Sequence, residues 1–456
     1  MVRYNLIQIP VIRTLLTNRW PQLIIRAFAL GGFLLAILAG FVGTPVGSRN
    51  FAIIIVWIAW WALLIMVAVP LFGRGWCNIC PIPMPGEWLQ NGSVLRPLEN
   101  KTGRGLKLRW PNKFRNIWLQ NVAFTAIALF SIVILTQPHI TGMVLLALIL
   151  FAVVISLIFE RRTFCRYLCP VGGFIGLYSQ VSPIEVRVRD TSVCAGHKDK
   201  TCYTGNEDGY GCPWGIFPGG MVKNTNCGTC MECLRTCPYD NIAVNLRPPG
   251  TDLLQQRGRK LDEAFKAFIM LGSAVVYSVV LIGPWGALKS AAFAVGSFAW
   301  WGYAMSFLAF VYVLLPGIFY LAVRYISQNT PGKRKPLRMF TEYAYALVPL
   351  GLAAWIAFSL SFVFTNVSYL WPVLSDPFSW GWNLFGAANS SWTPYFSKYI
   401  PAVQVVILIV GLFWSITVIQ RISGESTLSE HKPWRPWPVI AFSAFVTSGL
   451  LWLLVG

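Results

Sequence analysis

The chain has 456 residues, of which 55% are hydrophobic and only 12% are charged. A soluble domain carries about 25% charged residues, so this composition excludes an ordinary soluble enzyme, a small secreted disulfide scaffold and a disordered chain. The formal net charge of +20 would suit nucleic-acid binding, but in a membrane protein such an excess usually encodes orientation.

Apolar stretches long enough to cross a bilayer, each about 17–25 residues long, occur at roughly nine places along the chain. They cover residues 22–45, 51–71, 117–137, 142–159, 265–286, 299–323, 341–366, 401–420 and 437–455. We therefore predict an α-helical integral membrane protein with about nine transmembrane helices, surrounded by the lipid bilayer.

The basic residues are placed unevenly along this pattern. If the first helix leaves the cytoplasm, 34 of the 37 Lys and Arg residues fall in segments on the cytoplasmic side. Because basic groups resist translocation, we predict a multi-pass protein of the cytoplasmic (inner) membrane with its N-terminus inside and its C-terminus outside. The charge then requires no nucleic-acid partner. We interpret residues 1–21 as a basic interfacial segment rather than a cleavable signal peptide.

A polar insert divides the chain into three predicted regions. Residues 1–159 form a four-helix membrane region, residues 160–262 a cytoplasmic ferredoxin-like α+β domain, and residues 263–456 a five-helix membrane region. The insert holds nine of the eleven cysteines.

The strongest chemical signal is a run of four cysteines in this insert. It consists of Cys227, Cys230, Cys233 and Cys237, followed by Pro238. The spacing is that of bacterial ferredoxins, in which the first three thiolates bind one 4Fe-4S cluster and the fourth binds a second cluster. Zinc also accepts four thiolates, but zinc sites usually separate two cysteine pairs by a longer loop. Disulfides do not suit the reducing cytoplasm.

A second, stretched run precedes the first. It consists of Cys194, His197, Cys202 and Cys212, with Pro213 after the last. The ferredoxin pattern would group Cys212 with Cys227, Cys230 and Cys233, and Cys237 with Cys194 and Cys202. The second cluster then lacks one cysteine, and His197 is a candidate ligand because imidazole replaces thiolate in Rieske centres. The alternatives are a solvated His197 with a ligand from elsewhere, or a three-iron cluster.

Two further cysteine pairs, each followed by proline, come directly after membrane segments. They are Cys77 and Cys80 before Pro81, and Cys165 and Cys169 before Pro170. Because both follow even-numbered helices, both should lie at the same membrane face. The four thiols could hold a third cluster or another soft metal. They could instead be two separate redox pairs, or cysteines that only pack a tight turn.

Together these motifs resemble the membrane-bound polyferredoxins of the NapH and NosR type over roughly residues 50–250. The resemblance implies clusters that pass electrons between the quinone pool, or a cytoplasmic donor, and a redox enzyme or its maturation. The first membrane motif departs from the family in having two residues between its cysteines where three are usual. The stretched first ferredoxin run and the long extension after residue 264 are further departures.

The small number of histidines restricts the cofactors that the chain could bind. Besides His197 there are only His139 and His431, so we expect no bis-histidine haem b across the membrane. We also find no ionisable residue in the middle of a predicted span, which argues against a pump or transporter.

These observations predict a membrane-bound iron–sulfur electron-transfer protein with redox partner proteins, and quinone as one candidate partner. We expect an electron-transfer subunit of an oxidoreductase complex rather than a stand-alone enzyme. Two alternatives stay open: a maturation factor that reduces a metal or cofactor for another protein, and a non-redox membrane anchor. The tryptophans of the predicted outer loop 367–400 suit an aromatic belt or a docking surface.

Overall fold

The computed structural model describes residues 3–95, 103–329, 334–425 and 436–456. His431 lies outside these residues. The chain forms two compact units, and each is described here by itself. The first comprises residues 1–41, 67–120 and 142–252, and the second comprises residues 42–66, 121–141 and 253–456. The predicted three-region division of the chain stays a prediction.

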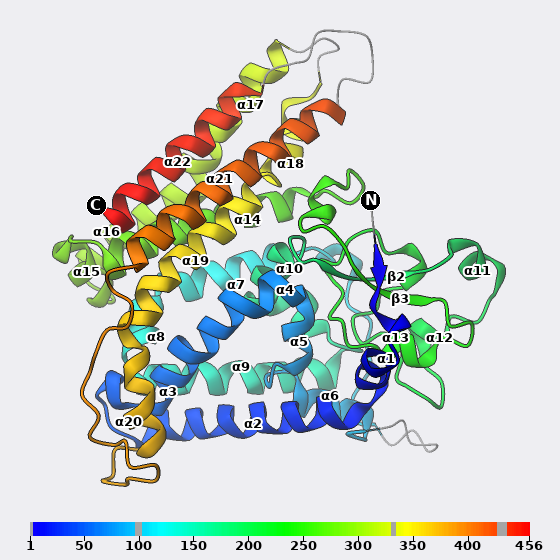
Figure 1. Cartoon of the computed structure of the whole chain (residues 1–456), viewed down its shortest axis with the longest axis horizontal. Helices are drawn as coiled ribbons and strands as arrows, with labels where there is room; N and C mark the ends of the chain where they lie inside the picture. Colours follow the sequence, from blue (N-terminus) through cyan, green and yellow to red (C-terminus); the bar gives the residue numbers. More distant parts are fainter. Residues whose placement is uncertain (1–2, 96–102, 330–333, 426–435) are drawn as a thin grey trace. The chain divides into compact units, whose positions relative to one another are not determined.

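The first unit combines membrane-type helices with a small sheet (Figure 1). Its helices, two of which extend slightly past the boundary, are α1 (Pro10–Thr17), α2 (Arg19–Val42), α4 (Val69–Phe72), α5 (Trp76–Ile79), α6 (Met84–Asn91), α9 (Pro138–Ile158), α10 (Pro170–Tyr178), α11 (Thr191–Gly196), α12 (Thr201–Thr204) and α13 (Glu232–Thr236). Its strands are β1 (Tyr4–Asn5), β2 (Ile184–Val188) and β3 (Ile242–Leu246).

The second unit is helical in its described residues. Its helices are α3 (Phe51–Ile53), α7 (Trp118–Leu129), α8 (Ser131–Thr136), α14 (Leu261–Tyr277), α15 (Gly286–Phe293), α16 (Phe298–Ala309), α17 (Leu315–Gln328), α18 (Pro336–Ala344), α19 (Leu347–Asn366), α20 (Leu370–Ser375), α21 (Ile400–Glu425) and α22 (Trp437–Val455). Stacked and edge-on rings join α14, α17 and α18 through Phe268, Phe319 and Phe340. The indole of Trp355 in α19 donates a hydrogen bond to the carbonyl of Met270.

Eight helical segments of the described residues are long and apolar enough to cross a membrane. They are Arg19–Val42, Phe51–Ile79, Pro138–Ile158, Leu261–Ile282, Phe298–Gln328, Leu347–Ser375, Ile400–Gly424 and Trp437–Val455. The prediction of an α-helical membrane protein is therefore confirmed. The remaining predicted span, 117–137, is interrupted at Phe130 between α7 and α8, where φ is −96° and ψ is 6°.

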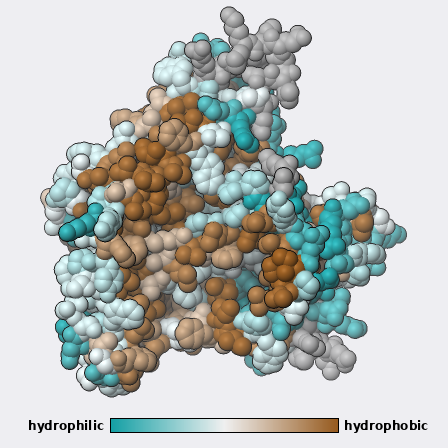
Figure 2. Space-filling model, viewed as in Figure 1, coloured by the Kyte–Doolittle hydropathy of each residue, from teal (hydrophilic) through white to brown (hydrophobic). Residues whose placement is uncertain are grey.

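The distribution of surface hydropathy agrees with this reading. In Figure 2, broad hydrophobic patches lie over the long helices around α21 and α22 of the second unit. Within the first unit, hydrophilic residues gather over the region of β2, β3 and α11. The sheet region is thus the water-facing part of its unit.

The sheet brings the N-terminus onto the cysteine-rich region. Its strand order is β1-β3-β2, with both pairings antiparallel and Tyr4 opposite Leu246. The segment predicted to lie at the membrane interface thus contributes a strand, and Arg3 pairs with the buried Glu185 at 2.8 Å. Ile7 packs in a buried cluster with Val186 and Met231, so the sheet supports the loop that carries the ferredoxin run.

Candidate iron–sulfur sites

The eleven cysteines form three groups in the first unit. We name them site A (Cys77, Cys80, Cys165 and Cys169), site B (Cys212, Cys227, Cys230 and Cys233) and site C (Cys194, Cys202 and Cys237). All eleven are free of disulfides. These groups coincide with the groupings drawn from the sequence, and the assignment of each group to a cluster stays a prediction.

Site A joins two segments that are far apart in the sequence. Cys77 lies in α5 and Cys80 ends it, whereas Cys165 lies in the π-helical turn Phe164–Leu168 and Cys169 ends that turn. Burial raises the pKa of the Cys165 thiol, and the nearby thiols of Cys169, Cys77 and Cys80 raise it further. The structure thus brings both membrane motifs into one buried group.

The π-helical turn explains why the two motifs differ in length. In the first motif the amide of Cys80 donates to the carbonyl of Trp76, four residues earlier. In the second, the amide of Cys169 donates to Phe164, five residues earlier, which is the pattern of a π-helix. Both closing cysteines then adopt extended backbone, with ψ of 129° and 119°. One wider turn therefore absorbs the extra residue and leaves the two motifs with equivalent ends.

Two buried arginines tie the motifs together reciprocally. Arg74 and Arg162 each stand three residues before the first cysteine of a motif. Arg162 donates to the carbonyl of Cys77 at 2.9 Å, and Arg74 donates to the carbonyl of Cys165 at 3.4 Å. Each motif is thus anchored by the arginine of the other, as expected for the two halves of a duplicated site.

Close backbone approach completes site A. The amide of Gly172 donates to the sulfur of Cys169 at 3.3 Å, and hydrogen bonds to sulfur tune the potential of iron–sulfur centres. A Cβ on Gly172 would lie 2.6 Å from the carbonyl oxygen of Cys165. That carbonyl also accepts a hydrogen bond from Gln120 at 3.0 Å. The position therefore requires glycine.

Site B surrounds a small cavity of about 20 Å³. All four cysteines of the site line it, together with apolar side chains that include Trp214, Met221 and Met231. Burial raises the pKa of the Cys227 thiol to about 11, so the protein without metal keeps this thiol neutral and a cluster must displace its proton. Four thiols around a cavity lined mainly by apolar side chains suit a 4Fe-4S cluster.

The backbone of the site B loop has the shape of an anion cradle. Thr229 and Met231 have φ of 46° and 63°, a region that residues other than glycine rarely enter. Alternating conformations of this kind point successive amides inward and form the nests seen at iron–sulfur sites. The amides of Thr229 and Glu232 donate hydrogen bonds to the sulfurs of Cys227 and Cys230.

Site C has three cysteines and one histidine beside them. Burial raises the pKa of Cys202 to about 11, and the nearby thiols of Cys237 and Cys194 add to the shift. The amide of Asn241 donates to the sulfur of Cys194 at 3.4 Å. The ring of His197 stacks on Tyr239 with centroids 4.4 Å apart. Its Nδ1 is buried and has no hydrogen-bond partner in the described part of the chain, and its role as a cluster ligand stays a prediction.

Zinc and a cubane cluster arrange their thiolate ligands differently. Zinc draws four ligands to about 2.0–2.3 Å from a single centre, whereas a cubane cluster takes each thiolate on a different iron. Within the described residues, no group of three or more His, Cys, Asp or Glu side chains is arranged to hold a single metal ion.

A short buried bridge connects sites A and B. Besides the carbonyl of Cys165 in site A, Arg74 donates to the carbonyl of Thr225 at 2.7 Å. Its guanidinium lies 4.4 Å from the ring centre of Trp214, which lines the site B cavity. The side chain is only 2% exposed. The equal spacing of Arg74 to Cys77 and of Arg162 to Cys165 in the sequence was the signal that could have paired the two arginines.

Comparisons with known proteins support the iron–sulfur assignment. The sequence pattern of a family described as a 4Fe-4S binding domain matches residues 53–100 and 141–188, which contain one half of site A each. Among curated proteins, the chain is 26% identical to the putative electron transport protein YccM of Escherichia coli (strain K12) over 136 residues, 29% of this chain and 35% of that protein. It is also 26% identical to the uncharacterized protein MJ0749 of Methanocaldococcus jannaschii over 216 residues, 47% of this chain and 79% of that protein.

The matches cover different shares of the two relatives. The chain spans about a third of the length of YccM and about four fifths of MJ0749. No solved structure matches it. The repeated 4Fe-4S match and the apolar helices make this chain a membrane iron–sulfur protein. The particular resemblance to the NapH and NosR type stays a prediction.

Proposed function

We propose that this protein relays electrons at the membrane surface through three iron–sulfur centres, one in each of sites A, B and C. The observation that carries the proposal is the bridge between sites A and B. There Arg74 donates to the carbonyl of Cys165 in site A and to that of Thr225, two residues before Cys227 of site B, and stacks on Trp214. Sites B and C are also close, since the thiol of Cys202 contributes to the raised pKa of Cys233. Electrons could therefore pass between site A, at the membrane face, and the sites of the water-facing sheet region in short steps.

The proposed ligands follow the three groups of thiols. Site A would hold a third 4Fe-4S cluster on two cysteines from each half of the duplication. Site B would use its four cysteines, and site C would use its three cysteines with His197. Bound clusters supply one-electron chemistry.

The protein's own side chains have defined tasks in this proposal. Arg74 and Arg162 fix the loops of site A by bonding to the carbonyls of Cys165 and Cys77. Burial excludes water from the thiols, and the two guanidinium groups place positive charge beside the site. Local charge, hydrogen bonds to sulfur and solvent exposure set the potential of such centres, so positive charge should favour the reduced form.

The proposed setting is a complex in the cytoplasmic membrane, with sites B and C facing the cytoplasm. The uneven distribution of Lys and Arg supports this orientation. The electron donor would be the quinone pool or a cytoplasmic protein, and the acceptor a partner redox enzyme. The printed description of YccM as a putative electron transport protein is consistent with such a role.

Anaerobic reduction of the purified full-length chain tests the relay. We expect photoreduced flavin to reduce centres in sites B and C first, and the centre in site A to follow within the same experiment, as monitored by electron paramagnetic resonance at low temperature. In Cys80→Ser/Cys169→Ser protein the site A signal should be missing while the other signals persist. Centres that no donor of physiological potential reduces would refute the relay and favour a non-redox anchor.

Copurification separates a respiratory subunit from a maturation factor. Under the proposal the chain, tagged and expressed in its native membrane, retains a redox enzyme at constant stoichiometry through two chromatographic steps. An association that is lost during washing and occurs only while the partner's cofactor is being assembled would support maturation instead.

A further inference from the structure

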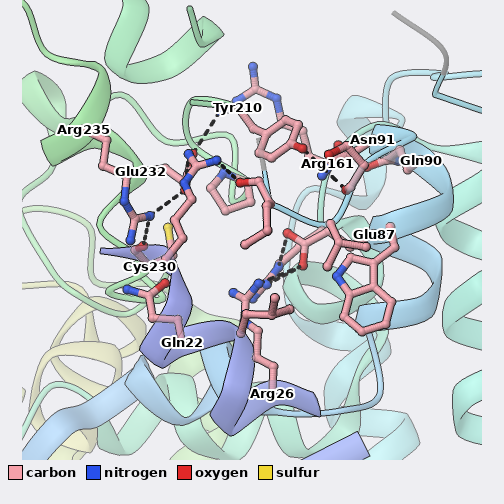
Figure 3. A pocket seen from close by; sticks show the side chains of 18 of the residues that line it. Gln22, Arg26, Glu87, Gln90, Asn91, Arg161, Tyr210, Cys230, Glu232 and Arg235 are labelled. Carbon is pink, nitrogen blue, oxygen red and sulfur yellow. Dashed lines mark hydrogen bonds and ion pairs between the residues drawn. The ribbon is translucent and has the colours of Figure 1, made fainter. Parts of the chain in front are cut away.

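A second cavity, distinct from the one inside site B, opens on the other side of that site's loop. It has a volume of about 100 Å³, whereas a single water needs roughly 10–15 Å³ measured this way. The first turns of α2, helix α6 with the loop after it, and helix α13 form its walls (Figure 3). The cavity can therefore hold several waters or one small ligand.

The walls of this cavity carry an excess of positive charge. Its arginines are Arg19, Arg26, Arg161, Arg162 and Arg235, and its carboxylates are Glu87 and Glu232. Five guanidinium groups thus face two carboxylates, a surplus of three positive charges among the described lining residues.

Each carboxylate is already shared between two of these arginines. Glu232 contacts Arg19 at 3.0 Å and Arg235 at 2.6 Å. On the opposite wall, Glu87 contacts Arg162 at 2.6 Å and Arg26 at 4.0 Å. Figure 3 shows Glu232 and Arg235 on one side of the open space and Glu87 and Arg26 on the other. After these pairings the five arginines of the lining still outnumber its two carboxylates.

A buried donor points to the same ligand chemistry. The indole Nε1 of Trp88, which lines the cavity, is buried and has no hydrogen-bond partner among the described residues. A buried N–H without a partner is costly. Guanidinium and indole groups only donate, so a ligand that satisfies them accepts hydrogen bonds and carries negative charge.

We propose that this cavity binds an oxyanion of the phosphate type. Cys212 and Cys230 of site B also line the cavity, so the bound anion lies beside the proposed cluster. Two sources supply this chemistry: free phosphate, and the phosphate of an anionic lipid headgroup. The second source suits α2, which continues from the cavity with exposed apolar residues such as Ile24 and Phe28. The binding does not depend on the relay proposed above.

The test measures anion binding directly on the full-length chain with its metal content intact. Protein stripped of lipid in neutral detergent is dialysed against radiolabelled inorganic phosphate, at fixed ionic strength. In parallel, native mass spectrometry counts lipids retained after purification from discs that contain phosphatidylglycerol. We expect one site per chain, filled by phosphate in the first arm or by phosphatidylglycerol in the second. Displacement of phosphate by the lipid identifies the headgroup as the ligand.

Two variants with matched controls locate the site. Trp88→Phe removes one N–H and Arg19→Gln removes one charge; each should weaken binding by roughly tenfold or more, because hydrogen bonds to charged groups are among the stronger ones. Trp110→Phe and Arg189→Gln should leave it unchanged, since Trp110 donates to Phe114 and Arg189 pairs with Asp240 at the surface.

Iron content, measured on the same samples, separates this proposal from the relay. If Arg19→Gln protein loses its iron, the binding measured for Trp88→Phe protein decides whether the cavity holds an oxyanion. Absence of stoichiometric binding in both arms, or equal binding by Trp88→Phe and parent protein of normal iron content, overturns the oxyanion site. Neither of these results would contradict the proposed electron relay.

Discussion

Sites A and B reach similar groups of four thiols by opposite routes. Three cysteines of site B lie within one short loop, whose cradle is set by the left-handed backbone of Thr229 and Met231. Site A assembles two motifs that are 88 residues apart, through hydrogen bonds from Arg74 and Arg162 to the opposite motif. Site B is therefore a locally encoded site and site A a tertiary one, and substitutions should affect them differently.

The largest expected effect is loss of the locally encoded cluster. Cys230→Ser protein should lose about four iron atoms per chain, because a 4Fe-4S cluster needs its four ligands. Metal binding is also folding free energy for small metal domains, so the sheet region should become sensitive to proteolysis. Met221→Leu changes the same cavity without touching a thiol and should keep its iron. Equal iron in the Cys230→Ser and parent proteins would contradict the ligand set of site B.

Next in size is loss of the tertiary clamp of site A. Arg162→Gln leaves Glu87 buried without its closest partner and frees the carbonyl of Cys77. Breaking a buried ion pair from one side costs about 3–5 kcal/mol, which thermal unfolding in detergent would register. The matched control is Arg13→Gln, whose pair with Asp240 is exposed and worth about 0.2–1 kcal/mol. Similar losses in both variants would show that Arg162 does not hold the site.

A smaller effect is expected where the backbone passes close to site A. Gly172→Ala places a methyl group 2.6 Å from the carbonyl oxygen of Cys165, and overpacking of this kind costs about 1–3 kcal/mol. Gly32→Ala meets nothing within 4 Å in α2 and should stabilise by about 0.5–1 kcal/mol, as alanine does in helices. Unfolding midpoints of the two variants that shift in the same direction would disprove the close approach.

The smallest effect concerns pH. Burial alone would raise the pKa of Glu87, but Arg162 and Arg26 outweigh it and hold that pKa below its usual value. The resulting stabilisation is fully present above the unfolded-state pKa of about 4.3 and is lost as pH falls through the lower folded-state pKa. Unfolding midpoints of parent protein should therefore fall at acid pH more steeply than those of Glu87→Gln protein. Parallel pH profiles would argue that the carboxylate is not paired.

The difference between the two routes also explains what sequence could predict. The grouping of Cys212 with Cys227, Cys230 and Cys233 around one cavity could be predicted because ligand spacing within one segment reports local geometry. The apolar helices were readable from their length. In contrast, the strand Tyr4–Asn5 pairs with residues some 240 positions later, and no local pattern carries that contact.

Site A could be predicted from the sequence only in part. Each Cys-Pro pair is weak alone, and the pair spacings of two and three residues concealed their equivalence. The π-helical turn that absorbs the extra residue depends on the backbone and could not be foreseen from composition. The break at Phe130, which divides one predicted span, likewise has no clear signal in hydropathy, because the helical segments before and after it are both predominantly apolar.

The central claim is that site A holds a cluster of its own, in addition to those of sites B and C. The most direct test is the iron and acid-labile sulfide content of anaerobically purified parent and Cys80→Ser/Cys169→Ser proteins, both recovered from the membrane. We predict that the double variant loses about four irons and four sulfides per chain while the spectra of the other centres persist. Identical iron and sulfide content in the two proteins would contradict the claim and leave these cysteines a structural role only.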